Sequence, residues 1–149
     1  MKKILIIGGG AMGSAFTFPC IDNKNEVTIT EPYNKTFIKN LSSKKKYHSS
    51  LKINLPQKLK YKKYSTDLLK NKYNLVVVAL SLSGINFISE EFKKSKVKSP
   101  ILILTKGLKY EKKRQKIFTI SEDIKKTNKN MNVSVLKGPC LAKELSNKK

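Results

Sequence analysis

The sequence predicts an α/β protein with a doubly wound, mostly parallel sheet. Segments with strand character alternate with segments of helical periodicity from end to end, as helix crossovers between parallel strands require. The runs at 74–80 and 101–105 are apolar and uncharged, which is typical of strands covered by helices on both faces. A third apolar run, at 3–7, leads directly into glycines with the spacing G-x-G-x-x-G.

The first half of the chain alternates strands and helices around these glycines. The predicted elements are a strand at 3–7, a helix from Ala11, a strand at 26–30, a helix at 34–41, a mobile basic loop at 42–50, an edge strand at 59–64 and a short helix capped by Ser65. Pro19 lies inside the first helix, where its ring and missing N–H predict a kink or an early end. Lysines along the edge strand discourage pairing with other chains.

The second half continues the alternation. Its predicted elements are a strand at 74–80, a helix at 83–92, a strand at 101–105, a long basic helix at 111–127, a strand at 131–136 and a helix that begins after Pro139. The inward side of the long helix is expected to carry Ile117, Phe118, Ile120 and Ile124.

The glycines predict a Rossmann-type dinucleotide site. Gly8 permits a tight turn, Gly10 leaves room for a diphosphate against the backbone, and Gly13 lets the next helix pack closely on the strand. The N-terminus of that helix faces the anion. Glu31 ends the second strand, where a carboxylate can bind the ribose 2′-OH and repel a 2′-phosphate. This favours NAD and leaves NADP open, although Pro32 would also hold Glu31 extended without a ligand.

Four predicted strand ends carry residues that suit a ligand site. These are Gly8–Gly13, Glu31, Thr105–Gly107 and Gly138–Cys140. Because the carboxyl ends of parallel strands meet at one edge of a sheet, the four groups are expected to converge there.

Charge and composition narrow the function. The net charge is +22, from 32 basic and 10 acidic residues, and such a field attracts anions. Nucleic acid is not the expected partner, because Arg114 is the only arginine and the lysines are spread over all segments. The distant Cys20 and Cys140 and the single His48 predict no metal site. No apolar stretch is long enough for a membrane span and no signal peptide is visible, so a cytoplasmic protein is expected.

Six segments occur in the order of a known family: Ile7–Gly13, Glu26–Ile29, Leu55–Lys60, Thr66–Leu68, Thr105–Leu108 and Gly138–Leu145. The first is generic, whereas T-K-G after one strand and G-P-x-x-A-K-E after the next are specific in combination. Together they resemble the N-terminal half of bacterial NAD(P)-dependent glycerol-3-phosphate dehydrogenase, over essentially the whole chain.

The resemblance implies reversible reduction of dihydroxyacetone phosphate to sn-glycerol 3-phosphate, a step in glycerophospholipid biosynthesis and carbohydrate metabolism. It implies cofactor contacts from Ala11, Met12, Lys106 and Ala142 besides the glycines and Glu31. It implies substrate contacts from Lys106, Gly138 and Cys140, and it allows a homodimer of the full-length form. Ordinary surface roles for Lys106 and Cys140 stay open.

The chain departs from the family at several positions. Met12 replaces a frequent aromatic residue, Ser81-Leu82 replaces Pro-Ser, and Cys140 replaces Ser or Thr. In the family an Arg or His often stands near the end of the second strand, where this chain has Glu31-Pro32, and this again favours NAD.

The family's second, helical domain carries its main catalytic lysine and its phosphate-binding arginine. Residues 1–149 are therefore expected to be a dinucleotide-binding domain without a catalytic residue, with the helical substrate domain absent. Two alternatives remain at this point. One is a free-standing NAD-binding module without catalysis, and the other is a reductase of the ketopantoate reductase or 6-phosphogluconate dehydrogenase type.

Overall fold

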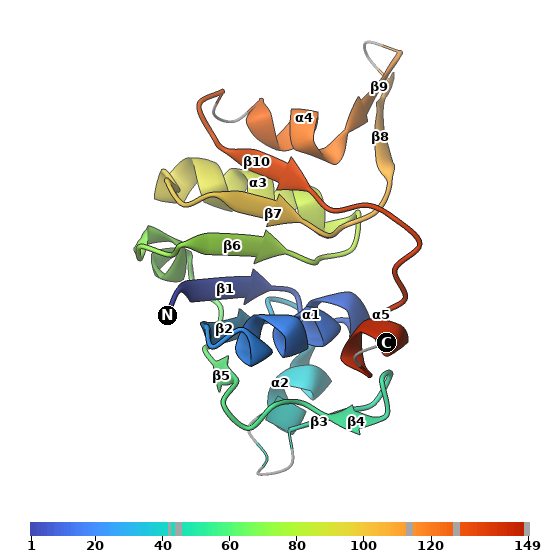
Figure 1. Ribbon diagram of the computed structural model, residues 1–149. Helices are drawn as coiled ribbons and strands as arrows, with labels where there is room; N and C mark the ends of the chain where they lie inside the picture. The colour runs from blue at the N-terminus through green and yellow to red at the C-terminus, as the bar shows by residue number, and fades with distance from the viewer. Residues whose placement is uncertain (42, 44–45, 113–114, 127–128, 148–149) are drawn as a thin grey trace.

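A computed structural model describes residues 1–41, 43, 46–112, 115–126 and 129–147 (Figure 1). Its main sheet has the strand order β10-β7-β6-β1-β2-β5, and each neighbouring pair is parallel. The strands are β1 (Lys3–Ile7), β2 (Glu26–Thr30), β5 (Lys60–Tyr61), β6 (Leu75–Val78), β7 (Ile101–Ile103) and β10 (Val133–Val135). The predicted parallel α/β architecture is confirmed, including the edge position of β5.

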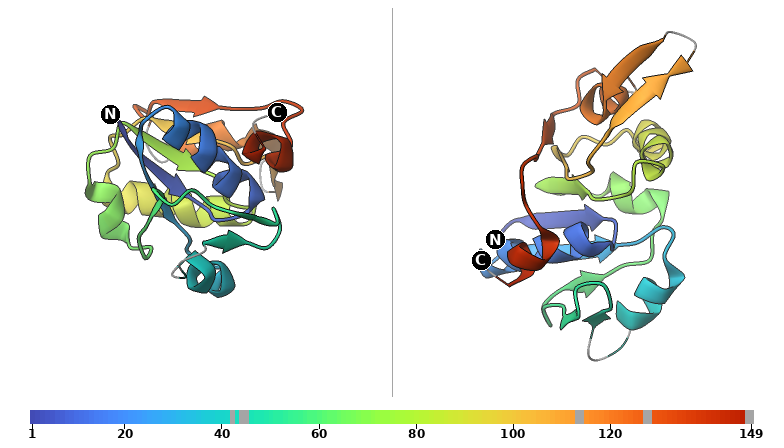
Figure 2. Two further views of the ribbon diagram at one scale, coloured as in Figure 1. Left: turned by 60° about the horizontal axis from the view of Figure 1, so that its bottom comes forward. Right: turned by 90° about the vertical axis from the view of Figure 1, so that its right-hand side faces the viewer.

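Helices cover both faces of this sheet (Figure 2). They are α1 (Ala11–Asp22), α2 (Lys35–Leu41), the 3₁₀ helix η1 (Thr66–Lys70), α3 (Gly84–Ser95), α4 (Ile120–Lys125) and α5 (Ala142–Ser146). Successive residues of β1 enter different cores because side chains alternate along a strand. Ile4 and Ile6 join the core that contains Cys20 of α1, whereas Leu5 and Ile7 join the core beneath α3 and α4. Burial raises the pKa of the Cys20 thiol to about 11, as expected for a core cysteine.

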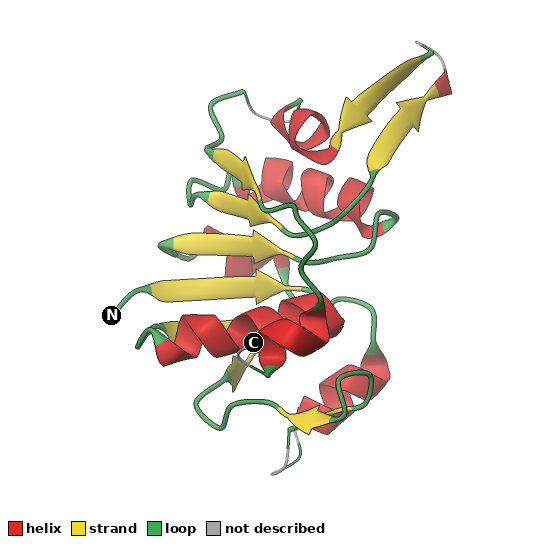
Figure 3. Cartoon of the chain, turned by 45° about the vertical axis from the view of Figure 1, so that its right-hand side comes forward, coloured by secondary structure: helices red, strands yellow, loops and turns green. Residues whose placement is uncertain are grey.

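The predicted long helix at 111–127 is wrong. An antiparallel hairpin of β8 (Leu108–Glu111) and β9 (Lys116–Thr119) covers the first part of this region and projects from the sheet (Figure 3). Thr119 has extended backbone and its hydroxyl accepts the N–H of Glu122, so α4 begins only after it. Of the expected inward set, Phe118, Ile120 and Ile124 are buried, but Ile117 is 60% exposed on the hairpin. Residues 113, 114 and 127 lie outside the described residues.

Three local predictions also need correction. Helix α1 continues through Pro19 to Asp22 instead of ending early. Ser65 precedes η1 as expected, but its side chain makes no capping hydrogen bond. The predicted loop at 42–50 contains a short strand, β3 (Tyr47–His48), which pairs with β4 (Ile53–Asn54). Residues 42, 44 and 45 of that loop lie outside the described part of the chain.

The strand directions position the site. Because β1, β2, β7 and β10 are parallel, the predicted site residues that follow them lie toward one edge of the sheet, the edge to which the strand arrows point on the right of Figure 3. Among the described residues, no helix is both long and apolar enough to cross a bilayer.

Candidate dinucleotide site

Gly8 and Gly13 are required by the packing of the protein itself. A Cβ on Gly8, whose φ is +115°, would lie 2.4 Å from the carbonyl oxygen of Ala79. A Cβ on Gly13 would lie 2.1 Å from the carbonyl oxygen of Gly8. These clashes agree with the tight turn and the close helix–strand contact predicted for the two glycines.

Gly10 has a different environment. It is exposed, and a Cβ built there would meet no protein atom within 4 Å. Gly10 is also the N-cap of α1, and without a side chain it offers no acceptor to the N–H groups of Ala11 and Met12 in the first turn. Both features fit a diphosphate. It would occupy the open space and accept hydrogen bonds from the uncapped amides.

Gly9 is a site residue that the sequence reasoning missed. A Cβ there would lie 2.0 Å from the ring of Phe37, so α2 leaves room only for glycine. The Gly9 N–H donates to Glu31 Oε2 at 2.6 Å. The only available signal was that three glycines are consecutive, instead of the two that the motif requires at this point.

Glu31 lies beneath the loop. Its side chain is buried, with the residue 6% exposed, and Oε1 accepts the N–H groups of Tyr33 at 2.8 Å and Asn34 at 3.1 Å. With Gly9 on Oε2, the carboxylate therefore accepts three backbone N–H groups and joins the glycine loop to the end of β2.

A small polar pocket of about 70 Å³ opens beside Gly9 and Gly10. The ring of Phe37 and side chains from α2 and the β3–β4 region complete its lining: Asn34, Thr36, Asn40, His48, Ser49 and Ser50. This lining offers hydrogen-bonding groups at the position where the adenosine end of a dinucleotide would lie relative to the loop.

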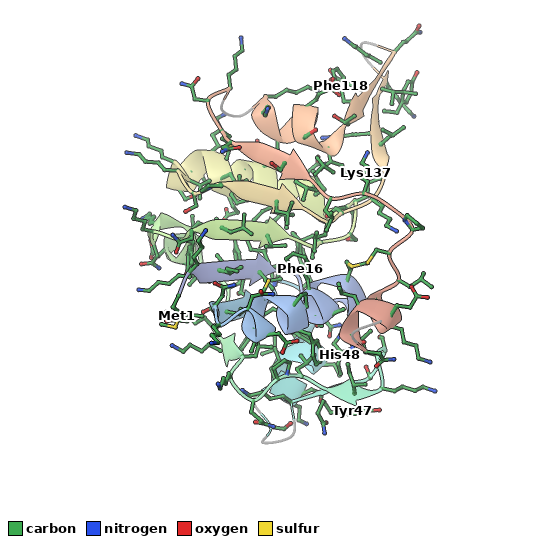
Figure 4. All side chains as sticks on the ribbon, viewed as in Figure 1. Met1, Phe16, Tyr47, His48, Phe118 and Lys137 are labelled. Atoms are coloured by element: carbon green, nitrogen blue, oxygen red, sulfur yellow. The ribbon has the colours of Figure 1, made fainter. Side chains whose placement is uncertain are left out.

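A second, apolar pocket of about 150 Å³ lies at the ends of β7 and β10. Its lining comes from α1, the two strand ends and α5: Met12, Phe16, Leu104, Lys106, Leu136, Lys137, Gly138, Cys140 and Leu145. Four predicted site residues, Met12, Lys106, Gly138 and Cys140, thus meet here. Phe16 of α1 and Lys137, which follows β10, are labelled in Figure 4 to mark two sides of this lining. A mainly apolar slot with two lysines, Lys106 and Lys137, in its lining suits a flat nicotinamide ring beside a polar substrate.

The tip of β7 holds Lys106 at this pocket. Thr105 is buried and its hydroxyl donates to the carbonyl oxygen of Leu80 at 2.8 Å, which joins the ends of β7 and β6. Lys106 is exposed, and its Nζ lies 3.5 Å from the carbonyl oxygen of Gly138. Ala142 instead begins α5, which packs on α1, and it is not among the residues that line the pocket.

The sequence profile of the NAD-dependent glycerol-3-phosphate dehydrogenase N-terminus matches residues 3–149. The chain belongs to this family. The group that fits the glycine loop is therefore a nicotinamide dinucleotide, NAD or NADP, and the family is one of oxidoreductases. No curated protein matches the chain in sequence.

Solved structures of this family share the fold. The glycerol-3-phosphate dehydrogenase of Coxiella burnetii superposes with a TM-score of 0.79 at 16% identity over 98% of this chain and 43% of that one. The enzyme of Plasmodium falciparum gives a TM-score of 0.79 at 20% identity over 99% and 43%. The 2-dehydropantoate 2-reductase of Methylococcus capsulatus is less similar, with a TM-score of 0.60 at 14% identity over 89% and 39%.

This chain therefore spans less than half the length of the two dehydrogenases. The described residues contain no group of three or more His, Cys, Asp or Glu side chains that could hold a metal ion. A larger hollow of about 750 Å³ lies at the amino ends of β6 and β7 and includes none of the predicted site residues.

Proposed function

We propose that this chain is the cofactor-binding half of a glycerol-3-phosphate dehydrogenase, which reduces dihydroxyacetone phosphate reversibly to sn-glycerol 3-phosphate. The observation that carries the proposal is Gly10. Nothing in the protein requires glycine there, yet a side chain would fill the space over the first turn of α1. Open space beside first-turn amides that no side chain caps is where a ligand diphosphate would bind.

When bound, a nicotinamide cofactor supplies the hydride that reduces the ketone. In this proposal the N–H groups of Ala11 and Met12 bind the diphosphate, and the apolar pocket beside Phe16 excludes water from the nicotinamide. The Lys106 ammonium places positive charge at the mouth of that pocket, where it would bind the substrate phosphate or polarise its carbonyl oxygen. Gly138 and Cys140 would provide further substrate contacts.

We further propose that the main catalytic groups come from a second, helical domain. The chain spans 43% of each of two similar enzymes, which supports this division. Leu108, Tyr110 and Ile117 of the hairpin are each more than half exposed, and a protein surface would cover them favourably. A homodimer of the full-length form remains part of the proposal.

The preference for NAD over NADP also belongs to this proposal. Glu31 places a carboxylate beneath the loop, and the described lining of the polar pocket contains no lysine or arginine for a 2′-phosphate. The free thiols of Cys20 and Cys140 suit a reducing cytoplasm. The spread of lysines over every segment argues against a nucleic-acid partner.

Gly10→Ser tests the proposal without disturbing the fold. Serine is a good N-cap, so the melting temperature should stay unchanged or rise, while its hydroxyl occupies the diphosphate space and accepts first-turn N–H groups. NADH affinity, measured by titration calorimetry, should fall at least about tenfold, or roughly 1.4 kcal/mol.

Gly9→Ser is the matched comparison. Its side chain would collide with Phe37, so the melting temperature should fall together with the affinity. If the folded parent chain binds neither NADH nor NADPH, or if Gly10→Ser binds NADH as the parent does, the proposed function is wrong.

A further inference from the structure

Both polar groups of Gly9 are held by side chains from elsewhere in the chain. Its N–H donates to Glu31, and its carbonyl oxygen accepts from Ser14 Oγ at 3.0 Å and lies 3.0 Å from His48 Nε2. Ser14 belongs to α1, Glu31 follows β2, and His48 belongs to β3. Side chains from three parts of the chain thus converge on the two peptide units that flank the Gly9 Cα.

The hydrogen bond at Nδ1 of His48 determines which of the two ring nitrogens carries the proton. Nδ1 accepts the backbone N–H of Leu51 at 3.2 Å, so it has no proton of its own. The proton is therefore on Nε2, which donates it to the Gly9 carbonyl oxygen. The residue is 4% exposed, and its ring packs edge-on against Phe37, with 5.5 Å between ring centroids. Neither ring nitrogen is left for another partner.

His48 also connects a separate piece of structure to the loop. Strands β3 and β4 pair with each other and not with the main sheet (Figure 4). The next two residues, Ser49 and Ser50, line the polar pocket beside Gly10. The hydrogen bond from His48 to Gly9 therefore joins the wall of this pocket to its floor.

Anchoring matters because the loop is intrinsically flexible. Three consecutive glycines have more backbone freedom than any other tripeptide, and binding a diphosphate requires one arrangement of their peptide planes. Each anchor that fixes the arrangement beforehand removes part of the ordering cost from binding. Losing one hydrogen bond of about 1 to 1.5 kcal/mol would weaken binding by about tenfold.

We propose that His48 is a positioning residue of the dinucleotide site. Its Nε2–H holds the Gly9 carbonyl group, so that the amides at 10–12 face the diphosphate, and it fixes the 46–55 segment as the wall at the adenosine end. This inference rests on the proposed function, because it assigns His48 to the same cofactor.

Two near-isosteric variants separate this role from a purely structural one. In His48→Gln the side-chain amide can take the place of Nε2 and donate to Gly9, while the bond to Leu51 is lost. In His48→Asn the side-chain oxygen can take the place of Nδ1 and accept from Leu51, while the bond to Gly9 is lost. A positioning role requires the Gly9 bond, whereas a turn-stabilising role requires the Leu51 bond.

The measurement is NADH affinity by titration calorimetry, with the melting temperature of each variant recorded alongside. We expect His48→Gln to bind within about threefold of the parent and His48→Asn to bind about tenfold more weakly. The loss of NADH affinity in His48→Asn should be larger than the loss that the lower stability of this variant, measured by its melting temperature, would cause. Equal affinities in both variants, or weaker binding by His48→Gln than by His48→Asn, would overturn the inference.

A second measurement uses the fact that His48 is the only histidine. Its ring ¹⁵N signals in the parent chain are unambiguous and report which nitrogen carries the proton. The expected state is protonated Nε2 with unprotonated Nδ1, and NADH should shift the Nε2 signal. The opposite tautomer overturns the inference even if neither variant folds. Absence of NADH binding by the folded parent would instead contradict the proposed function, and the ring signals still test the contact with Gly9.

Discussion

At the scale of single residues, the glycines of the loop are required for different physical reasons. Gly8 and Gly13 prevent collisions within the backbone, and Gly9 avoids the ring of Phe37. Gly10 makes no such contact, and in the proposed function it leaves room for the diphosphate. Substitutions at the four glycines should therefore have different consequences.

Glu31 provides the residue-scale prediction. In Glu31→Gln one amide oxygen replaces two carboxylate oxygens that accept three N–H groups, and the new NH₂ group faces donors. We expect a loss of about 1–3 kcal/mol in the free energy of unfolding, measured with urea. Glu26→Gln, at the other end of β2, is the control because Glu26 forms only a partly exposed ion pair with Lys60. Equal stability losses in the two variants would contradict a special role for Glu31.

At the scale of elements, a buried carboxylate joins η1 to α3. Glu91 of α3 accepts hydrogen bonds from Thr66 and from Tyr64, the latter at 3.1 Å, and pairs with Lys94 at 3.1 Å. The hydrogen bond from Thr66 is the main cause that lowers the pKa of Glu91 below its ordinary 4.5. The connection holds η1 against the helix that covers β6 and supports the sheet behind the site.

Because the pKa of Glu91 is lower in the folded chain, its ionised form stabilises the fold above about pH 4.5. That contribution is lost as the pH falls through the folded-state pKa. Glu91→Gln should therefore cost about 1–2 kcal/mol at pH 7 and much less at acid pH. Unfolding titrations of the parent and Glu91→Gln at several pH values measure the difference. Glu90→Gln, at the exposed neighbouring position, is the control variant. A cost of Glu91→Gln that does not change with pH would contradict the prediction.

At the scale of the whole molecule, the dominant feature is its charge of +22. Such a charge attracts an anionic cofactor. The basic side chains also repel one another, which destabilises the folded state. The described ion pairs join only a minority of the 32 basic residues to carboxylates, because the chain has 10 acidic residues.

Salt should therefore stabilise the fold while it weakens cofactor binding. Raising NaCl from about 10 mM to about 300 mM shortens the screening length from roughly 30 Å to under 10 Å. We expect the melting temperature to rise by about 2–5 °C, and the NADH dissociation constant to increase over the same range. Calorimetry in NaCl and KCl checks that the effect follows ionic strength. A constant or falling melting temperature would show that repulsion between the basic residues does not limit the stability of the fold.

Much of the fold could be predicted because its signals are local. The uncharged run at 75–78 became the central strand β6, and the glycine spacing located the loop after β1. The helix prediction is wrong at 111–119 because the lysines and scattered apolar residues there suit a helix as well as a strand. The capping hydrogen bonds at Thr119 and the pairing of Tyr110 with Ile117 decided for the hairpin.

The sequence by itself determined the parallel sheet, the loop that fits a diphosphate and the convergence of Lys106, Gly138 and Cys140. Alternation, burial and strand direction are enough for these, since each follows from neighbouring residues and one topological rule. Only the tertiary structure decided that Glu31 and His48 both bind Gly9, from 22 and 39 positions away. Side-chain contacts over such distances depend on how the elements pack, and no local pattern encodes them.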